Sequence, residues 1–229
     1  EFINRCPRYC LWLGDCSPSE LRKMPECIKR VEAVRQFRLA SKRAATVRLA
    51  ERPTRFQSEI MPDSTSIIIP KVSSERRRYV PIGFIPPGAL CSDLVFIIPN
   101  ATLYHFGILT SNVHMAWMRV VCGRLKSDYR YSKDVVYNNF PWPNPSDKQK
   151  AKIEQTAKAI LDARSLYPDS SLADLYDANG MSQAPELLKA HQQNDRAVWE
   201  AYGKAWDIKS EPACVACLMK MYQQLVNNG

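Results

Sequence analysis

Two charged side chains of opposite sign lie two residues apart in a segment rich in cations and aromatic rings. Lys126 and Asp128 belong to the segment RLKSDYRY, residues 124–131. A surface that bound only phosphates would need cations alone, because a carboxylate repels phosphate oxygens. In the major groove of a duplex, however, lysine can donate to guanine and aspartate can accept from the amino group of cytosine. The spacing therefore predicts either the reading of one G·C pair or an ordinary surface ion pair.

Further cations gather in two earlier segments. The segment KVSSERRR, residues 71–78, lies between two strand-like runs, where a loop can present hydroxyl and guanidinium groups to phosphates. Along a predicted helix, Arg35, Arg38 and Lys42 fall on one stripe that continues an apolar stripe, so this face would leave the core and meet an anion. The alternative is a solvated helix end.

The segment Asn139-Phe140-Pro141-Trp142 is similar at first sight to the catalytic tetrapeptide of enzymes that methylate amino groups on bases. That tetrapeptide has two prolines before its aromatic residue, and here Phe140 takes the place of the first proline. The eight glycines are too far apart to form GxG, the turn that lets the backbone approach S-adenosylmethionine. We therefore expect no catalytic residue, and interpret the segment as a proline-ended strand with buried aromatic residues.

The spacing of cysteine and histidine predicts no metal site. Cys214 and Cys217 have the spacing of a zinc-ligand pair, which Cys6 and Cys10 could complete only if the two ends of the chain met. The alternative, which we favour, places Cys214 and Cys217 on the apolar face of a final helix. The cysteines are unevenly spaced and no secretion signal places them in an oxidising compartment, so reduced thiols are expected.

The net positive charge of the chain lies in its first part. Residues 1–143 contain 22 Lys+Arg against 12 Asp+Glu, whereas residues 144–229 contain 10 against 11. Such an asymmetry is typical of a part that meets a polyanion such as DNA. Three prolines between 141 and 145 coincide with this change, so we predict one domain over residues 1–143 and a second over residues 144–229. No apolar run is long enough to cross a bilayer, and a cytoplasmic protein without a membrane partner is expected.

The elements that must position these residues are of mixed type in the first domain. The strands are predicted at residues 9–13, 66–72, 79–85 and 90–98. The helices are predicted at residues 18–51, with an interruption near Pro25, and at 103–121, with a break around residues 110–112. After Pro145 only helices are expected, near residues 147–166, 172–178, 185–202 and 212–226. The predicted fold class is therefore α/β, a mixed α+β domain followed by an all-helical subdomain, with Ser17, Ser111 and Ser146 as helix caps.

Several longer strings resemble one family of proteins. They are RYCLWL (8–13), IPKVSSERRRYVPIGF (69–84), IIPNATLYHFGILTS (97–111), HMAWMRVVCGRL (114–125) and YRYSKDVVYNNFPWP (129–143). These strings look like the target-recognition region of MmeI-like DNA methyltransferases of restriction-modification systems. Members of this family are large bacterial polypeptides that join an adenine-specific methyltransferase, and often a nuclease, to one recognition domain. Later segments around Leu175-Tyr176 and from Ala190 to Gly203 resemble the family's helical C-terminal part.

The resemblance implies a non-catalytic module that recognises double-stranded DNA. In the family, pairs at about the positions of Lys71 with Asp93, and of Lys126 with Asp128, select individual base pairs, and here both pairs suit G·C. The phosphates would be bound by Arg35, Arg38, Lys42, Ser73, Ser74, Arg76, Arg77, Arg78, Arg124 and Arg130. No cofactor is expected in this chain; S-adenosylmethionine would belong to a methyltransferase domain elsewhere in the same polypeptide, which would be a second partner beside DNA.

Two alternatives stay open. The first is that the chain methylates DNA itself, although its start without methionine suggests a piece of a longer polypeptide. The second is a protein-interaction module of a larger DNA-modifying enzyme, in which the basic face serves an acidic partner or lies in solvent and no base pair is read.

Overall fold

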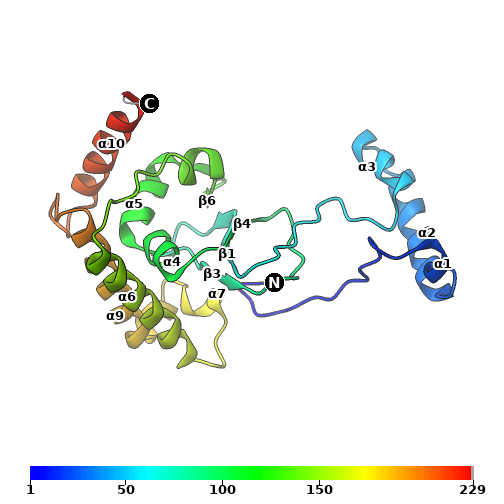
Figure 1. Cartoon of the computed structure of the whole chain (residues 1–229), viewed down its shortest axis with the longest axis horizontal. Coiled ribbons are helices and arrows are strands. Elements are labelled where there is room, and N and C mark those ends of the chain that lie inside the picture. The colour runs from blue at the N-terminus through cyan, green and yellow to red at the C-terminus, as the bar shows by residue number, and fades with distance from the viewer. Residues whose placement is uncertain (228–229) are drawn as a thin grey trace. The chain divides into compact units, whose positions relative to one another are not determined.

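The chain forms two compact units, and each is described here by itself. The computed structural model describes residues 1–227. Unit 1 consists of Glu1–Cys6, Met61–Ala89 and the residues from Asp93 onward, and unit 2 consists of Pro7–Ile60 with Leu90–Ser92. Figure 1 labels the helices and strands of both units along the chain. All the named strands lie in unit 1, whereas the regular structure of unit 2 is helical.

The first two helices of unit 2 begin at prolines. Ser17 caps α1 (Pro18–Leu21), because its Oγ accepts from the Glu20 N–H at 3.2 Å. A second helix, α2 (Pro25–Leu39), starts at Pro25, since a proline lacks the N–H that an interior helix position requires. The predicted interruption near Pro25 is therefore confirmed. α3 (Ala44–Arg48) and the 3-10 turn η1 (Leu49–Glu51) follow.

The strand predicted at residues 9–13 is wrong. These residues form no helix or strand, and Tyr9 is 94% exposed. The short apolar run fits a buried strand, but a strand also needs a neighbour to pair its backbone N–H and C=O groups. No described strand pairs with residues 9–13.

The first sheet of unit 1 has three antiparallel strands. β1 (Ser66–Pro70) lies between β3 (Gly83–Ile85) and β4 (Val95–Pro99), and Ile67 is opposite Phe84 on one side and Ile98 on the other. The strands predicted over residues 79–85 and 90–98 are therefore shorter than expected. Pro81 explains the first difference, because it cannot donate to a ladder.

The second sheet is smaller and was not predicted as such. β6 (Asp128–Arg130) lies between β2 (Val72–Ser73) and β5 (Gly123–Leu125), all antiparallel. β5 and β6 form a hairpin whose two turn residues are Lys126 and Ser127. This hairpin contains Lys126 and Asp128, the pair with opposite charges.

Two helices follow the first sheet, with the predicted break between them. α4 (Leu103–Leu109) ends just before Ser111, and α5 (Asn112–Val121) begins just after it. The Ser111 Oγ accepts from the His114 N–H at 3.3 Å and donates to the Ile108 carbonyl at 2.7 Å. One side chain therefore helps to end α4 and to begin α5.

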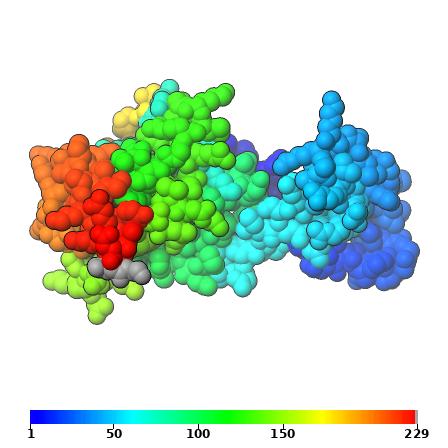
Figure 2. Space-filling view, turned by 90° about the horizontal axis from the view of Figure 1, so that it is seen from above, coloured from blue at the N-terminus to red at the C-terminus, as the bar shows by residue number. Residues whose placement is uncertain are grey.

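The remainder of unit 1 is helical, as predicted. It contains α6 (Asp147–Ser165), α7 (Leu172–Leu175), α8 (Gly180–Gln183), α9 (Pro185–Ala201) and α10 (Glu211–Asn227). Ser146 caps α6, and the Ser146 N–H and Oγ in turn donate to the Gln149 side chain. α6 and α9 run side by side (Figure 1), and α10 lies at the surface (Figure 2, red).

The C-terminal helices pack directly on α4. A Cβ atom added to Gly107 would lie 2.6 Å from Ile153 Cγ2 and 3.2 Å from Ala157 Cβ, so only glycine allows α4 to approach α6 this closely. The Gly107 carbonyl accepts from Asn194 Nδ2 of α9 at 2.7 Å. Because these helices share one compact unit with the sheets, the domain boundary at residue 143 stays a prediction.

A buried histidine joins α5 to the second sheet. His114 Nε2 and the Tyr131 hydroxyl lie 2.9 Å apart, and the His114 ring packs edge-on against Phe140 with centroids 4.6 Å apart. Burial lowers the pKa of His114 to about 3, since the charged imidazole would lose its hydration. The His114 ring is therefore neutral in the folded protein near pH 7.

The segment that contains Phe140 is not a strand. A π-helical turn, η2 (Lys133–Tyr137), is followed by residues 138–146 without helix or strand. Phe140 is buried, as predicted, and Trp117 Nε1 of α5 donates to the Val136 carbonyl at 3.0 Å. The aromatic residues of this segment thus belong to the core.

Asp195 of α9 is a buried carboxylate shared by two other segments. It accepts from the Tyr79 hydroxyl and from the Asn112 N–H, both at 2.7 Å. Asn112 begins α5, where the N–H groups have no partner within the helix. Burial raises the pKa of Asp195 to about 6, and the two hydrogen bonds oppose this rise. One side chain of α9 therefore holds both the start of α5 and the segment that follows residues 71–78.

Replacing Asp195 with alanine should lower the free energy of unfolding by about 2–4 kcal/mol, because the Tyr79 hydroxyl and the Asn112 N–H would be left buried without partners. Urea denaturation followed by circular dichroism measures this loss. Asp162→Ala is the control, because Asp162 is exposed and pairs only with Lys158 of its own helix at 2.7 Å. The control should lose less than about 0.5 kcal/mol. Equal losses in the two variants would contradict the role of Asp195.

Acidification should destabilise the fold through His114. Its pKa is about 3 when folded and near 6.5 when unfolded, so the unfolded chain binds more protons between these values and stability falls as the pH drops. From pH 7 to pH 5 the expected loss is about 2 kcal/mol. His191, whose pKa is also lowered by burial, acts in the same direction, whereas Asp195, whose pKa is raised, opposes it below about pH 6. Unfolding measured at pH 5, 6 and 7 should show a flatter dependence for His114→Gln, and an unchanged slope would refute this assignment.

Candidate nucleic-acid interface

Lys71 lies where the two sheets of unit 1 meet. Its N–H donates to the Leu94 carbonyl at 3.0 Å, which extends the pairing of β1 with β4 by one residue. Its carbonyl accepts from the Tyr131 N–H at 2.8 Å, which extends the pairing of β2 with β6. Asp93 directly precedes Leu94, and Asp128 lies three residues before Tyr131, or about 10 Å along the strand. Asp93 therefore lies next to the residue that pairs with Lys71 on one side, and Asp128 lies about 10 Å from the residue that pairs with Lys71 on the other side.

Aromatic rings pack against the side chain of Lys71 at this junction. The Lys71 ammonium lies 4.6 Å from the centroid of the Phe96 ring, and the Phe96 and Tyr131 rings are 6.1 Å apart. Tyr131 is buried and meets His114, as described above. A row of packed rings thus connects the Lys71 side chain to the core helix α5.

The hairpin of β5 and β6 presents Lys126 at its tip. Lys126 is exposed and takes a φ of 57°, a left-handed conformation that favours glycine. Along β6 the half-buried Asp128 and the exposed Arg130 alternate with the buried Tyr129, so Asp128 and Arg130 share the outer face. Within residues 1–227 no ion pair or side-chain hydrogen bond joins Lys126 to Asp128. The surface ion pair that the spacing allowed is therefore not formed.

Arg124 binds within the hairpin and to the neighbouring loop. Its guanidinium carbon lies 4.0 Å from the centroid of the Tyr129 ring, directly across from it in the strand pairing. Its Nη1 donates to the Ser127 carbonyl at 2.8 Å and lies 3.5 Å from Glu75 Oε2. Arg124 was predicted to contact phosphate, but in this structure its guanidinium already has three partners.

The loop between β2 and β3 holds the predicted run of arginines. Arg76 and Arg78 are exposed, and Arg77 is half-buried. Arg76 forms an exposed ion pair with Asp177 at 3.6 Å. Ser73 differs from the expectation, because it is buried and only 3% exposed, and its hydroxyl has no partner among the described residues. Ser73 is therefore not part of the exposed basic surface. Ser74 is half-buried and remains a candidate for a phosphate contact.

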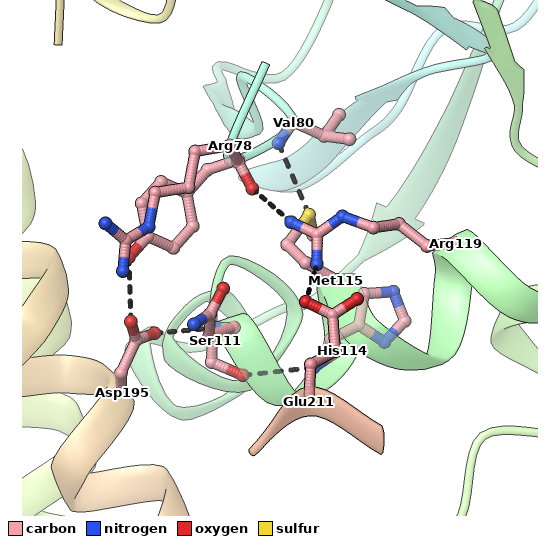
Figure 3. A network of polar contacts seen from close by, with 10 residues as sticks. Arg78, Val80, Ser111, His114, Met115, Arg119, Asp195 and Glu211 are labelled. Atoms are coloured by element: carbon pink, nitrogen blue, oxygen red, sulfur yellow. Dashed lines mark hydrogen bonds and ion pairs between the residues drawn. The ribbon is translucent and has the colours of Figure 1, made fainter. Parts of the chain in front are cut away.

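The end of this loop is anchored by α5 and by the C-terminal helices. Arg119 of α5 donates to the Arg78 carbonyl and to the Glu211 carboxylate of α10, both at 2.8 Å (Figure 3). The next residue, Tyr79, donates to Asp195. Sequence reasoning missed these anchors. A lone arginine in the apolar run MAWMRVV was the one signal that pointed to Arg119, and nothing marked Asp195.

In unit 2 the three predicted cations have different environments. Arg35 is exposed on α2 and lies 4.0 Å from Glu32 of the same helix. Arg38 donates to three backbone carbonyls, those of Leu49 and Arg52 at 2.9 Å and of Arg55 at 2.7 Å. α2 ends at Leu39, so Lys42 lies in the link to α3 and does not continue a helical stripe as predicted. Arg38 thus fixes the fold of unit 2, and Arg35 and Lys42 are the exposed cations.

The described residues contain no group of three or more His, Cys, Asp or Glu side chains placed to hold a metal ion. Cys214 is buried on α10 together with Leu218. No helix described by the structure is long and apolar enough to cross a membrane.

Comparisons with known proteins agree on one family. The model of the MmeI target recognition domain matches residues 1–144, and the model of the MmeI C-terminal domain matches residues 145–228. DNA methyltransferase A of Bacillus subtilis (strain 168) is 37% identical over 225 residues, which are 98% of this chain and 25% of that protein. A solved structure of the type IIL restriction-modification enzyme MmeI in complex with DNA superposes with a TM-score of 0.92 and 45% identity, over 99% of this chain and 30% of that one.

The chain therefore spans about a quarter to a third of the length of these two relatives. Both matching models describe regions outside the catalytic domain, which confirms the prediction that this chain is not the catalytic part. The long strings that resembled one family and the fold built from them lead to the same result. The chain belongs to the MmeI family, of which it comprises the target recognition domain and the C-terminal domain.

Proposed function

We propose that the chain recognises double-stranded DNA by sequence, and that Lys71 with Asp93 and Lys126 with Asp128 read base pairs in the major groove. The observation that carries this proposal is the junction at Lys71, where one residue pairs with Leu94 on one side and with Tyr131 on the other. Asp93 lies next to one of these two partners, and Asp128 lies on β6, the strand that the other partner directly follows. The similarity to MmeI, whose structure was solved in complex with DNA, supports the same conclusion.

The chemistry of both pairs suits G·C. A lysine ammonium donates to guanine O6 and N7, and an aspartate carboxylate accepts from cytosine N4, so one Lys/Asp pair can contact both bases. Lys126 adds a further argument, because a non-glycine residue in a left-handed conformation at a turn is often found where function requires it. Its exposed position at the hairpin tip leaves the ammonium free to enter a groove.

Phosphate contacts would position the duplex without reading its sequence. In unit 1 the exposed or half-buried candidates are Ser74, Arg76, Arg77, Arg78 and Arg130. In unit 2 they are Arg35 and Lys42. Ser73 is omitted because it is buried, and Arg38 and Arg124 because each guanidinium has three partners in the folded chain. Arg35 and Arg76 are kept, because each has a single ion pair, which is exposed.

For the whole polypeptide we propose site-specific methylation of the exocyclic amine of adenine. DNA methyltransferase A is the name of a relative that is four times as long as the matched region, so a catalytic domain fits outside this chain. Its cofactor would be S-adenosylmethionine, and the residues present here do not fit that group, because no two of the eight glycines form GxG. This chain would set the register of the duplex while the catalytic part extrudes one adenine.

Binding of the chain to duplex DNA should depend steeply on salt. With roughly six phosphate contacts, the logarithm of the association constant should fall with the logarithm of salt concentration with a slope of about −5. Fluorescence anisotropy of a labelled duplex measures this slope. Arg76→Ala should reduce its magnitude by about one, whereas Lys220→Ala, which removes an exposed cation of α10, should leave it unchanged. No binding at low salt would overturn the proposal.

Exchanging the charges of the hairpin pair should change preference at one base pair. The variant is Lys126→Glu with Asp128→Arg, and the duplexes are a site selected from a randomised library and its single-pair substitutions. Each lost base contact should cost about 1–3 kcal/mol at that pair alone. Lys133→Glu with Asp134→Arg makes the same charge change at two exposed residues outside the hairpin and should keep the original preference. A uniform loss across all duplexes would make Lys126 and Asp128 phosphate contacts or structural residues instead.

One observation favours a second role for unit 2. Phe37 of α2 is 77% exposed, and no residue of α2 is buried. Monomeric proteins seldom expose large apolar side chains in groups, and such groups often mark contacts with another protein surface. Unit 2 would then dock on a protein rather than on DNA. DNA affinity unchanged by Arg35→Ala and Lys42→Ala together would favour this role.

A further inference from the structure

The outer strand β5 and the turn of the hairpin that carries Lys126 have few contacts with the rest of the described chain. β5 pairs only with β6, and its three residues, Gly123, Arg124 and Leu125, are all exposed. The turn residues Lys126 and Ser127 are exposed as well. β6 is held by β2 on its other side, so β5 and the turn are the parts with few buried contacts, and such exposed edges open locally most easily. A residue that reads one base pair must nevertheless be held to within a fraction of an ångström.

Arg124 supplies contacts that this geometry otherwise lacks. Its guanidinium carbon lies over the Tyr129 ring, 4.0 Å from the centroid, and Tyr129 is buried. It closes the turn by donating to the Ser127 carbonyl at 2.8 Å. It also reaches across to Glu75 in the basic loop, at 3.5 Å. One side chain therefore links the edge strand, the turn and the loop that follows β2.

We propose that Arg124 is a positioning residue for base recognition, which orients Lys126 and Asp128 by stacking on Tyr129 and closing the turn at Ser127. This inference rests on the proposed function, because it concerns the accuracy of base reading. A planar guanidinium can stack on a ring and donate in its own plane at the same time. A lysine ammonium is a compact charge that cannot make both contacts in this way. The planar shape of the Arg124 side chain is thus required, and a positive charge alone is not sufficient.

The competing role is a direct phosphate contact, and the two roles predict different results. A phosphate contact by Arg124 would be kept largely by Arg124→Lys, and Arg124→Ala would reduce the magnitude of the salt slope by about one. A positioning role predicts the reverse pattern. Both variants would lose discrimination at the base pair read by Lys126 and Asp128, and neither would change the slope.

The test uses the full chain with a duplex selected by the wild-type protein and three duplexes substituted at the pair read by the hairpin. For Arg124→Lys, discrimination among these duplexes should fall roughly fivefold to tenfold, while salt dependence stays the same. Glu75→Ala, which removes the contact to the loop and leaves Tyr129 and Ser127 in place, should cause a smaller loss of about twofold. Arg196→Lys makes the same exchange at an exposed residue of α9 and should have no effect.

A measurement without DNA separates this inference from the proposed function. Amide hydrogen exchange should be roughly fivefold faster over residues 123–128 in Arg124→Lys than in the wild-type chain, and unchanged in Arg196→Lys. If the wild-type chain shows no base preference, the proposed function fails, although the exchange result still reports on the hairpin. If the wild-type chain discriminates and Arg124→Lys discriminates equally well with unchanged exchange, Arg124 does not position the hairpin.

Discussion

The arrangement of the two sheets of unit 1 depends on a backbone junction of two hydrogen bonds at Lys71. The N–H bonds to Leu94 and the carbonyl to Tyr131, so two small sheets that would each be weak alone share one residue. Backbone groups at a sheet edge cost free energy when they are buried without partners, and this junction satisfies them on both sides. It also determines which side chains become neighbours. The segments that contain Lys71, Asp93 and Asp128 are distant in the sequence, and the backbone bonds of Lys71 join all three segments.

The C-terminal helices contribute hydrogen bonds that hold the segments around this junction. Asp195 of α9 accepts from Tyr79, which follows the basic loop, and from Asn112, which begins α5. Glu211 of α10 accepts from Arg119, which also donates to the Arg78 carbonyl at the end of that loop. From α5, His114 reaches Tyr131, which is the partner of Lys71. A connected set of hydrogen bonds therefore runs from the C-terminal helices to the junction. The C-terminal helices therefore help to hold the segments around the junction in place.

Local signals allowed part of this structure to be predicted. Ser17, Ser111 and Ser146 cap helices, as predicted. A serine hydroxyl that accepts from the first N–H groups of its own helix makes a local interaction, so the sequence alone allows it to be predicted. The run at residues 9–13 was misjudged, because a strand depends on a neighbour that no local pattern reveals. The β5–β6 hairpin was missed because the buried Tyr129 and Tyr131 stand among charged residues. Arg38 and Arg124 were interpreted as free cations, since the carbonyls and the ring that engage them come together only in the folded chain.

The central claim is that two lysines read two guanines in the major groove, and interference by guanine N7 methylation tests it most directly. A methyl group at N7 blocks the acceptor that a lysine would use. With a duplex selected by the wild-type chain, methylation should weaken binding at two or more guanines. One of these effects should disappear in Lys71→Ala only, and another in Lys126→Ala only. If methylation at no guanine interferes, or if both variants lose the same interference, the two lysines do not read separate base pairs.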